Sequence, residues 1–446
     1  MQKNIRITVA IFLIINISGL KTRVEAEQPL DHPSTEQLEM EAFIDGFIAG
    51  KMPANNIAGV VISVVRDGRI FLTRGYGYAN VSRRLPVDPG KTLFRIGSIS
   101  KLFTWTAVMQ LVEQGKIDLY ADVNSYLDFK IPPDYPNSIN LSHLMSHTSG
   151  FEERTFGIQP DTPEQLTPLG KWLKTHIPAR VRPPGQLSAY SNYGVALAGY
   201  IVEQVSGIPF DEYIEKNILL PLGMLNSSSR QPLPAPLFKN LSQGYFFANS
   251  EYHPQPFETF NVAPAASFSA SAMDIARFMI AHLNNGRYRE SIILQPATAK
   301  LMHTRHFSHN PRLPGWSHGF IEMNMNEQHI IGHAGETAFF QSRLMLFPDH
   351  NIGIFISTNT EGGDVITKSF QQAFVNRYFP FSTKSSPTLP PHPMGNFNRF
   401  NGSYHTTLIS YTTPDVRRQL LCPVATIILS DPFTINTKHN YNNSNT

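Results

Sequence analysis

Apolar positions along the chain form short strand-like runs near both ends and helix-spaced patterns between them. The runs at 57–65 and 70–78 are rich in β-branched residues, and an Asp-Gly step between them indicates a hairpin turn. A second pair of strands is predicted at 339–347 and 352–357. Strands at both ends predict an α+β fold whose sheet is closed by segments that are distant in sequence.

Helical periodicity marks three stretches between these strands. Residues 102–114 carry apolar side chains three and four positions apart. A second helix is predicted near 194–205, and a third over 271–283 with Ser271 as its N-cap. The stretch 120–190 is rich in Pro, Asp, Ser and Thr, which predicts loops and short helices over an inserted helical lobe.

The two ends of the chain have a different character. Residues 1–26 combine basic residues, an apolar stretch and the small-residue pattern Val24-Glu25-Ala26, which predicts a signal peptide, with an uncleaved membrane anchor as the alternative. A globular domain is expected over 36–379 and a Pro-rich linker over 380–395. Residues 396–446 are few for a second core, so we interpret them as a small or partial C-terminal appendage.

Composition narrows the classes of partner. The 446 residues include 37 Lys and Arg against 34 Asp and Glu. The predicted signal peptide holds four of the basic residues and one acidic residue, so 33 of each remain in the mature chain. This balance gives no electrostatic case for nucleic acid. A single cysteine, Cys422, excludes an intramolecular disulfide framework and a cysteine-based metal site.

Several common catalytic motifs are absent from the sequence. It contains no His-Glu-x-x-His, no Gly-x-x-x-x-Gly-Lys-Ser/Thr, no Gly-x-Gly-x-x-Gly and no Gly-x-Ser-x-Gly. His143 and His147 stand four apart, but no third ligand has an obvious spacing, so we interpret them as packing or hydrogen-bonding residues. We therefore predict neither a metal nor a cofactor.

A serine and a lysine stand three residues apart where a predicted strand leads into the helix at 102–114. Ser98 falls near the first turn, where free backbone N–H groups favour negative charge on its oxygen. Helical geometry places the Lys101 amine on the same face, within reach of that hydroxyl. Burial lowers the pKa of a lysine, so Lys101 is a candidate proton acceptor. An ordinary helix cap beside a surface lysine is the alternative.

Two later segments complete a pattern. Tyr190-Ser191-Asn192 leads into the predicted helix near 194–205, and Gly332-His333-Ala334-Gly335 precedes a predicted strand. In this order, the three elements together resemble the class C β-lactamase and penicillin-binding serine hydrolase family. The segments 144–150 and 221–224 are similar to signatures of that family, and the resemblance covers roughly residues 40–378.

The resemblance implies a β-lactamase/transpeptidase-like fold, an antiparallel sheet flanked by helices with an inserted helical lobe. It also implies roles for single residues. Ser98 would be the acyl-forming nucleophile and Lys101 its proton acceptor. Tyr190 would pass protons to and from the leaving group, and Asn192 would hold the substrate amide. The backbone N–H groups of Ser98 and of Glu336, which follows Gly335, would form the oxyanion hole.

Two positions depart from the family pattern. β-Lactamases usually carry lysine at the position of His333. Replacement of that lysine by histidine is found among DD-peptidase and esterase-like members of the family. We expect its charge to appear only as the pH falls through the ordinary histidine range. Glu336 stands where serine or threonine is usual, and its carboxylate would oppose a substrate carboxylate. Both departures favour neutral acyl substrates over β-lactams.

Three other Tyr-x-Asn segments start at Tyr78, Tyr135 and Tyr441. The first and last lack the family order, and Tyr135 is interpreted as part of a surface turn. The expected protein is an exported serine hydrolase, periplasmic or secreted, that acts on a small-molecule or peptide substrate. A membrane contact is expected only if the N-terminal segment stays uncleaved. The sequence gives no basis for predicting whether the chain is a monomer or an oligomer. The alternatives are a true class C-like β-lactamase and a catalytically silent envelope-binding protein of the same fold.

Overall fold

An antiparallel sheet of nine strands organises the described part of the chain. The computed structural model describes residues 34–160, 162–381, 402–404, 425–431 and 434–439. Across the sheet, the strands are β11 (Arg305–Phe307), β12 (Trp316–Ser317), β13 (Ile321–Glu322), β14 (Ile331–Glu336), β15 (Gln341–Phe347), β16 (Ile352–Thr358), β1 (Gly59–Arg66), β2 (Arg69–Asn80) and β3 (Leu85–Pro86). Because β1 pairs with β16, distant segments close the sheet as the sequence predicts.

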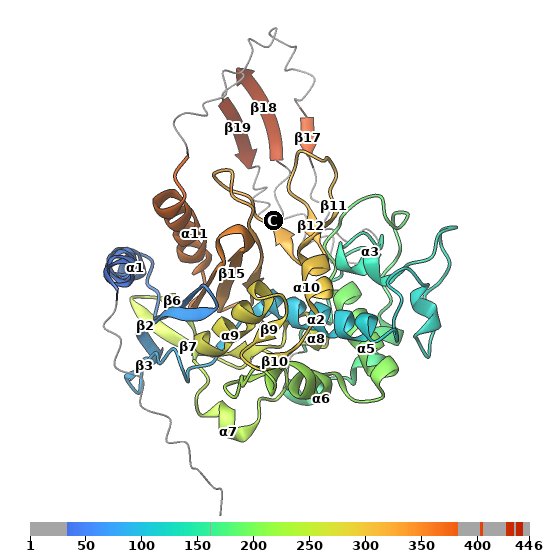
Figure 1. Cartoon of the computed structure of the whole chain (residues 1–446), viewed down its shortest axis with the longest axis horizontal. Coiled ribbons are helices and arrows are strands. Elements are labelled where there is room, and N and C mark those ends of the chain that lie inside the picture. The colour runs from blue at the N-terminus through green and yellow to red at the C-terminus, as the bar shows by residue number, and fades with distance from the viewer. Residues whose placement is uncertain (1–33, 161, 382–401, 405–424, 432–433, 440–446) are drawn as a thin grey trace, which may run out of the picture.

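Two helices cover one face of this sheet, α1 (Thr35–Ala54) and α11 (Asp364–Tyr378), which lie together on the left in Figure 1. Alternate side chains of β1, among them Val60, Ile62 and Val64, are buried against these helices. From α11, Ile366 and Phe370 complete the cluster. The period-two alternation of a strand therefore assigns one side of β1 to this core.

The other face of the sheet packs on the helical lobe. Val61 and Val65 of β1 join a larger apolar cluster there, which includes most apolar positions of the predicted helix at 102–114, with Val112 packed against it. The helices are α2 (Ser100–Glu113), α3 (Leu141–Met145), α4 (Leu169–Thr175), α5 (Asn192–Ser206), α6 (Phe210–Ile214), α7 (Ala235–Phe238), α8 (Ala263–Ala266), α9 (Ala272–Leu283) and α10 (Pro296–His303). Helix α9 lies against β1 and β16, whereas α2 and α5 pack on each other. The inserted helical lobe is thus confirmed.

Local sequence signals explain several boundaries. The β1–β2 hairpin turns at Asp67 and Gly68, both with positive φ, as the Asp-Gly step predicts. The Ser271 side chain accepts a hydrogen bond from the Asp274 N–H and caps α9. In the same way, the Ser191 side chain accepts from the Gly194 N–H and caps α5. The predicted helices near 194–205 and 271–283 are therefore confirmed.

Short strands outside the main sheet form smaller ladders. They are β4 (Phe94–Arg95), β8 (Ser269–Ala270) and β5 (Ser227–Ser228); β6 (Gly244–Ala248) and β7 (Glu251–Gln255); β9 (Arg287–Tyr288) and β10 (Ser291–Ile292); and β17 (Gly402–Tyr404), β18 (Ala425–Asp431) and β19 (Thr434–His439). The predicted signal peptide and linker lie outside the described residues. Of the predicted appendage, the structure describes three strands that pair in the order β17-β18-β19.

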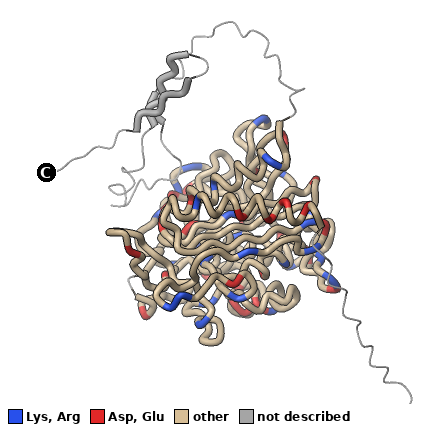
Figure 2. Tube along the Cα trace, turned by 90° about the vertical axis from the view of Figure 1, so that its left-hand side faces the viewer, with Lys and Arg blue, Asp and Glu red and all other residues tan. Residues whose placement is uncertain are grey.

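Acidic and basic residues are interspersed over the described part of the chain in the view of Figure 2. This distribution agrees with the balanced composition of the predicted mature chain. Among the described residues, no helix has the length and apolar character needed to cross a bilayer.

Candidate active site

Ser98 lies at the start of the long helix of the lobe. It is the central residue of a 3-10 turn, Gly97–Ile99, between β4 and α2. The Ser100 hydroxyl donates to the Gly97 carbonyl and accepts from the Phe268 N–H at 3.1 Å, which fixes the turn against β8. Ser98 is half-buried, so its hydroxyl remains reachable from solvent. The first-turn position expected from the sequence is thus a tight turn that precedes the α-helix.

Lys101 is fully buried, and its amine lies among three oxygens. Its Nζ is 2.9 Å from the Ser98 Oγ, 2.8 Å from the Asn192 Oδ1 and 2.9 Å from the carbonyl oxygen of Ala265. Burial lowers the pKa of Lys101 to about 7, although the Glu153 carboxylate raises it in part. The amine is therefore balanced between its charged and neutral forms near neutral pH.

The Tyr190-Ser191-Asn192 segment enters the same site at the N-terminus of α5. The Tyr190 hydroxyl is hydrogen-bonded to Ser98, and the Lys101 Nζ lies 4.9 Å from the centre of the Tyr190 ring. Burial raises the pKa of Tyr190, so the phenol is neutral at physiological pH. The structure thus brings Ser98, Lys101, Tyr190 and Asn192 together.

Strand β14 lines the opposite side of Ser98. The sequence placed Gly332–Gly335 before a strand, and β15 does follow them, but a strand at these residues themselves was not predicted. These residues lie inside β14, where Gly332 pairs with Met345 and Gly335 with Ser342. The glycines are needed because a Cβ on Gly335 would lie 1.9 Å from the carbonyl oxygen of Ile96.

The backbones of β14 and the 3-10 turn meet closely beside Ser98. A Cβ on Gly97 would lie 2.6 Å from the backbone nitrogen of Glu336, and Gly97 itself has a φ of 51°. A positive φ is strained for side chains other than glycine. The backbone nitrogen of Glu336 is therefore next to the turn that carries Ser98, while the Glu336 side chain is exposed.

His333 is buried and neutral. It is only 2% exposed, and burial, with Lys101 nearby, lowers its pKa to about 3. Its Nδ1 is hydrogen-bonded to the Ala334 carbonyl, so Nδ1 carries the proton in the neutral ring. The expected titration of His333 within the ordinary histidine range is therefore wrong, because the burial was not visible in the sequence.

Two further residues belong to this site. The Glu153 Oε1 accepts from the Asn192 Nδ2 at 2.7 Å, and its Oε2 accepts from the Asn192 N–H at 3.0 Å. The His147 ring stacks on the Tyr190 ring, and its Nδ1 accepts from the Ser191 N–H at 3.0 Å. His147 was interpreted as a packing or hydrogen-bonding residue, which agrees with these contacts. Glu153 was missed, although it closely follows the 144–150 signature.

A cavity of about 280 Å³ opens beside Ser98. It extends between β14, β15 and the start of α11. Two cations, Arg343 and Lys368, and two carboxylates, Glu336 and Asp364, line it, so the formal charges of its lining cancel. Lys368 also pairs with Asp364 at 2.7 Å, and Arg343 donates to Gln371 at 2.8 Å. Of the four charged residues that line the cavity, only Glu336 was predicted.

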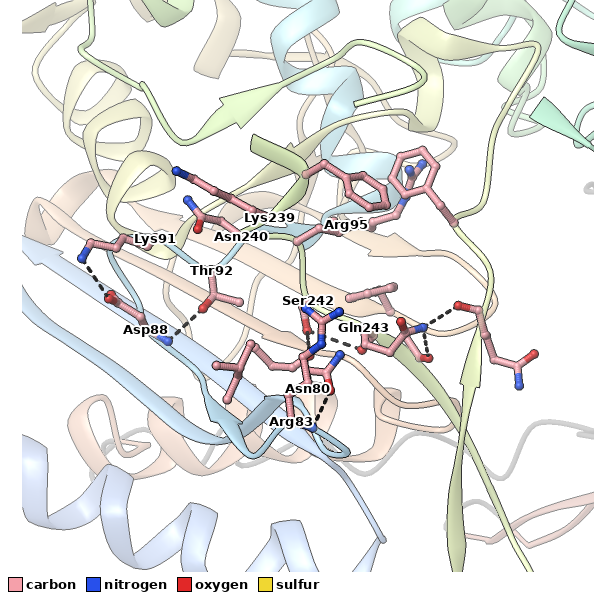
Figure 3. Close-up of a pocket in the computed structure, with 18 of the residues that line it drawn as sticks. Asn80, Arg83, Asp88, Lys91, Thr92, Arg95, Lys239, Asn240, Ser242 and Gln243 are labelled. Atoms are coloured by element: carbon pink, nitrogen blue, oxygen red, sulfur yellow. Dashed lines mark hydrogen bonds and ion pairs between the residues drawn. The ribbon is translucent and has the colours of Figure 1, made fainter. Parts of the chain in front are cut away.

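A larger cavity of about 480 Å³ has no lining residue in common with the Ser98 cavity. Figure 3 shows Arg83, Lys91, Arg95 and Lys239 around it. Lys91 pairs with Asp88 at 3.9 Å, and the Arg95 guanidinium lies 4.2 Å from the centre of the Phe257 ring. Among the described residues that line this cavity, no lysine amine contacts a serine hydroxyl. The predicted nucleophile, Ser98, therefore lies at the smaller cavity.

The competing Tyr-x-Asn segments lie elsewhere. Tyr78 is in β2 and exposed, and Tyr135 lies in a bend under the guanidinium of Arg180. Tyr441 lies outside the described residues. Within the described part of the chain, no group of three or more His, Cys, Asp or Glu residues is arranged to hold a metal ion.

Sequence comparison identifies bacterial relatives of this chain. Protein flp of Staphylococcus aureus is 27% identical over 327 residues, which are 71% of this chain and 62% of that protein. The chain therefore spans less than two thirds of that relative. The putative penicillin-binding protein PbpX of Bacillus subtilis is 32% identical over 183 residues, 40% of this chain and 44% of that protein.

Solved structures and a family model complete the comparison. The octameric penicillin-binding protein homologue from Pyrococcus abyssi is 27% identical with a TM-score of 0.66, over 76% of this chain and 78% of that chain. EstCE1, a hydrolase with promiscuous acyltransferase activity, is 22% identical with a TM-score of 0.61, over 74% and 96%, and supports the fold alone. The sequence model of the Beta-lactamase family matches residues 44–376. Since this match spans most of the chain, the protein belongs to the Beta-lactamase family and has its fold.

Proposed function

We propose that this protein is a serine acyl-hydrolase that forms an acyl-enzyme on Ser98. The observation that carries the proposal is the 2.9 Å contact between the Ser98 Oγ and the amine of the fully buried Lys101, whose pKa burial lowers to about 7. A neutral lysine has two N–H groups and one lone pair. The N–H groups donate to Asn192 and Ala265, and the lone pair accepts the hydrogen bond of the Ser98 hydroxyl.

Acylation follows from this arrangement. The Lys101 amine takes the Ser98 proton as the Oγ bonds to the substrate carbonyl carbon, and the carbonyl π electrons move to its oxygen. The N–H groups of Ser98 and Glu336 stabilise that oxyanion. When the intermediate collapses, the bond to the leaving group breaks, and Tyr190 gives that group a proton and is reprotonated from Lys101. Water then attacks the ester in the same way and releases the acid and free Ser98.

The proposed substrate is a neutral peptide, amide or ester more than a carboxylate-bearing β-lactam. Neutral His333 supplies no charge where a lysine would, and the charged residues of the Ser98 cavity cancel. An esterase-like activity, or a DD-peptidase-like activity at a bond without a neighbouring free carboxylate, therefore fits the site better than efficient β-lactam hydrolysis. The name of the relative PbpX, a putative penicillin-binding protein, agrees with a serine hydrolase of this family.

The proposed location is the periplasm or the cell exterior. It rests on the basic and apolar pattern of residues 1–26 in the sequence. Mass spectrometry of the N-terminus of the protein from its native host checks it. A mature protein that starts at Glu27 supports export with cleavage, and a retained Met1 in a soluble cell fraction contradicts it.

A fluorescent phosphonate that acylates active serines tests the proposed mechanism. Wild type should be labelled on Ser98, and Ser98→Ala should lose the label while its melting temperature changes little. Lys101→Ala should be nearly as impaired, because members of one proton-transfer unit act non-additively. Ser82→Ala, an exposed serine, is the matched control and should label normally. Wild type that reacts with no acylating probe would instead support a silent binding protein.

A further inference from the structure

Glu153 is a buried carboxylate behind the proposed catalytic residues. It is only 3% exposed, and it lies in the loop after the 144–150 signature. Both carboxylate oxygens accept hydrogen bonds from Asn192, one from the side-chain Nδ2 and one from the backbone N–H. Burial of a carboxylate costs free energy unless hydrogen-bond donors compensate for the lost water. The two hydrogen bonds from Asn192 supply such donors and are therefore part of the structure of the site.

The contact determines which way the Asn192 amide points. An amide has a donor end and an acceptor end, and the carboxylate of Glu153 can bind only the donor end when it is ionised. The Asn192 Nδ2 therefore faces Glu153, and its Oδ1 faces the Lys101 amine at 2.8 Å. One amide group thus links the carboxylate to the amine.

The charges at the two ends act on each other. Burial raises the pKa of Glu153 to about 7 and lowers that of Lys101 to about 7, while each charged form favours the other. The other titratable groups near the amine are His147, His333 and Tyr190. All three are neutral near pH 7, since burial lowers the pKa of both histidines and raises that of the tyrosine. Glu153 is therefore the negative charge that acts on Lys101.

We propose that Glu153 is a positioning residue that orients the Asn192 amide toward Lys101 and, through its charge, sets the pH at which Lys101 becomes a base. The inference rests on the proposed function and goes beyond it, because it assigns control of the base to a residue that does not touch the substrate. The ionised carboxylate favours the charged form of Lys101, so the amine becomes neutral at a higher pH than it would without Glu153.

The test is the pH dependence of phosphonate labelling from about pH 5 to about pH 9, a window that spans both titrations. In Glu153→Gln the attraction on the ammonium is lost, so the acid limb of the labelling rate should move to lower pH by about one unit. The plateau should also fall, because glutamine offers one acceptor where Asn192 presents two donors. Glu153→Asp keeps the charge and should return the limb toward its wild-type position.

Glu203→Gln is the matched control. It removes a carboxylate from the same helix, about 16 Å along the axis from Asn192, and keeps the oxygen that accepts from the Phe210 N–H. The acid limb of the labelling rate of Glu203→Gln should coincide with that of wild type. A lower plateau with an unmoved limb in Glu153→Gln would show a merely structural role and overturn the proposal.

A second measurement does not depend on turnover. In protein labelled with ε-¹³C lysine, the resonance missing from Lys101→Arg reports the titration of Lys101. Its midpoint should be lower in Glu153→Gln than in wild type, and an equal midpoint in both would overturn the inference. The two proposals fail separately: label on Ser98→Ala at the wild-type rate refutes the acyl-enzyme, whereas unchanged Lys101 titration refutes the role of Glu153. Circular dichroism and melting confirm that each variant is folded.

Discussion

The imidazole of His147 stacks on the phenol ring of Tyr190, with ring centroids 4.3 Å apart and an interplanar angle of 28°. The same ring accepts the Ser191 N–H, so one side chain supports Tyr190 in two ways. His147 also has a φ of 54°, a region in which asparagine is better tolerated than most residues. These properties allow the stack and the hydrogen bond to be tested separately.

We predict that His147→Asn keeps an acceptor for the Ser191 N–H and the backbone conformation but loses the stack. The kcat/KM of the acyl reaction should fall about tenfold through misplacement of Tyr190, with a modest loss of stability. His147→Phe keeps an aromatic ring but leaves a buried N–H without its acceptor, which should cost about 1–3 kcal/mol in unfolding free energy. Urea unfolding and initial rates distinguish the two. Wild-type rates in both variants would show that Tyr190 does not depend on His147.

A methyl group on Gly335 tests the close approach of β14 to the serine turn. We predict that Gly335→Ala abolishes labelling of Ser98 and lowers the unfolding free energy by about 2–4 kcal/mol, because its Cβ would meet the Ile96 carbonyl at 1.9 Å. Gly50→Ala is the control. It lies in α1 with no atom within 4 Å of the new Cβ, and should stabilise the protein by up to about 1 kcal/mol. Normal labelling by Gly335→Ala would contradict the assigned oxyanion geometry.

Part of this site was predictable because its residues follow one another in local motifs. Ser98 and Lys101 stand three residues apart across the 3-10 turn and the start of α2, and Asn192 starts a helix whose cap is visible in the sequence. Glu153 was not predictable, since its partner Asn192 is 39 residues away and no periodicity links them. The same holds for Arg343 and Lys368, which reach the cavity only because β15 and α11 pack together.

The fold shows the same division. The β1–β2 hairpin and the helices α2, α5 and α9 have local signals of turn, period and cap, and these were predicted, whereas α1 and α11 were not. Strand β14 was not, because Gly332, His333 and Gly335 have low strand propensity, and pairing with β15 overrides it. The burial that keeps the His333 ring neutral likewise depends on tertiary packing. The residues that carry the chemistry could therefore be predicted from the sequence, whereas the burial and neighbouring charges that shift their pKa values could not.

Buried histidines make the fold sensitive to acid. His147, His282 and His333 are each no more than 2% exposed, and burial holds their pKa well below the ordinary value near 6.5. As the pH falls below 6.5, the unfolded chain takes up protons there that the folded chain does not. Glu153 and Asp274 oppose this, since burial raises their pKa to about 7 and about 6, and the folded chain binds those protons first.

Burial also lowers the pKa of His143, His303, His306 and His318 and raises that of Glu203, so seven histidines stand against three carboxylates, and the unfolded chain takes up more protons than the folded chain. We predict that the unfolding free energy is highest above pH 6.5 and falls down to about pH 5 by at least about 1.4 kcal/mol per pH unit, the slope for one net proton. His282→Gln removes one of these histidines and should reduce the slope by about 1.4 kcal/mol per pH unit. His309→Gln, at an exposed site, should leave it unchanged. Urea unfolding across this range measures the effect, and a flat wild-type profile would contradict it.

The neutral ring of His333 gives the site no cation for a substrate carboxylate. Since burial lowers the pKa of His333 to about 3, the ring stays neutral from about pH 5.5 to about 8.5, and acid does not supply the charge that a lysine would. For wild type, the ratio of kcat/KM for a carboxylate-bearing ester to that for a matched neutral ester should therefore show no rise around pH 6.5. His333→Lys should raise the ratio about tenfold, the effect of roughly 1.4 kcal/mol of added attraction.

His333→Gln is the control, since it is neutral and polar and should keep the wild-type ratio. His333→Lys also places a second ammonium near Lys101, which should lower the pKa of Lys101 and move the acid limb of both rates to lower pH. That common shift cancels in the ratio, so the ratio isolates the contact with the substrate carboxylate. If the ratio is equal in wild type and His333→Lys, position 333 does not set charge selectivity, and Arg343 and Lys368 at the other end of the cavity become the groups that meet the carboxylate.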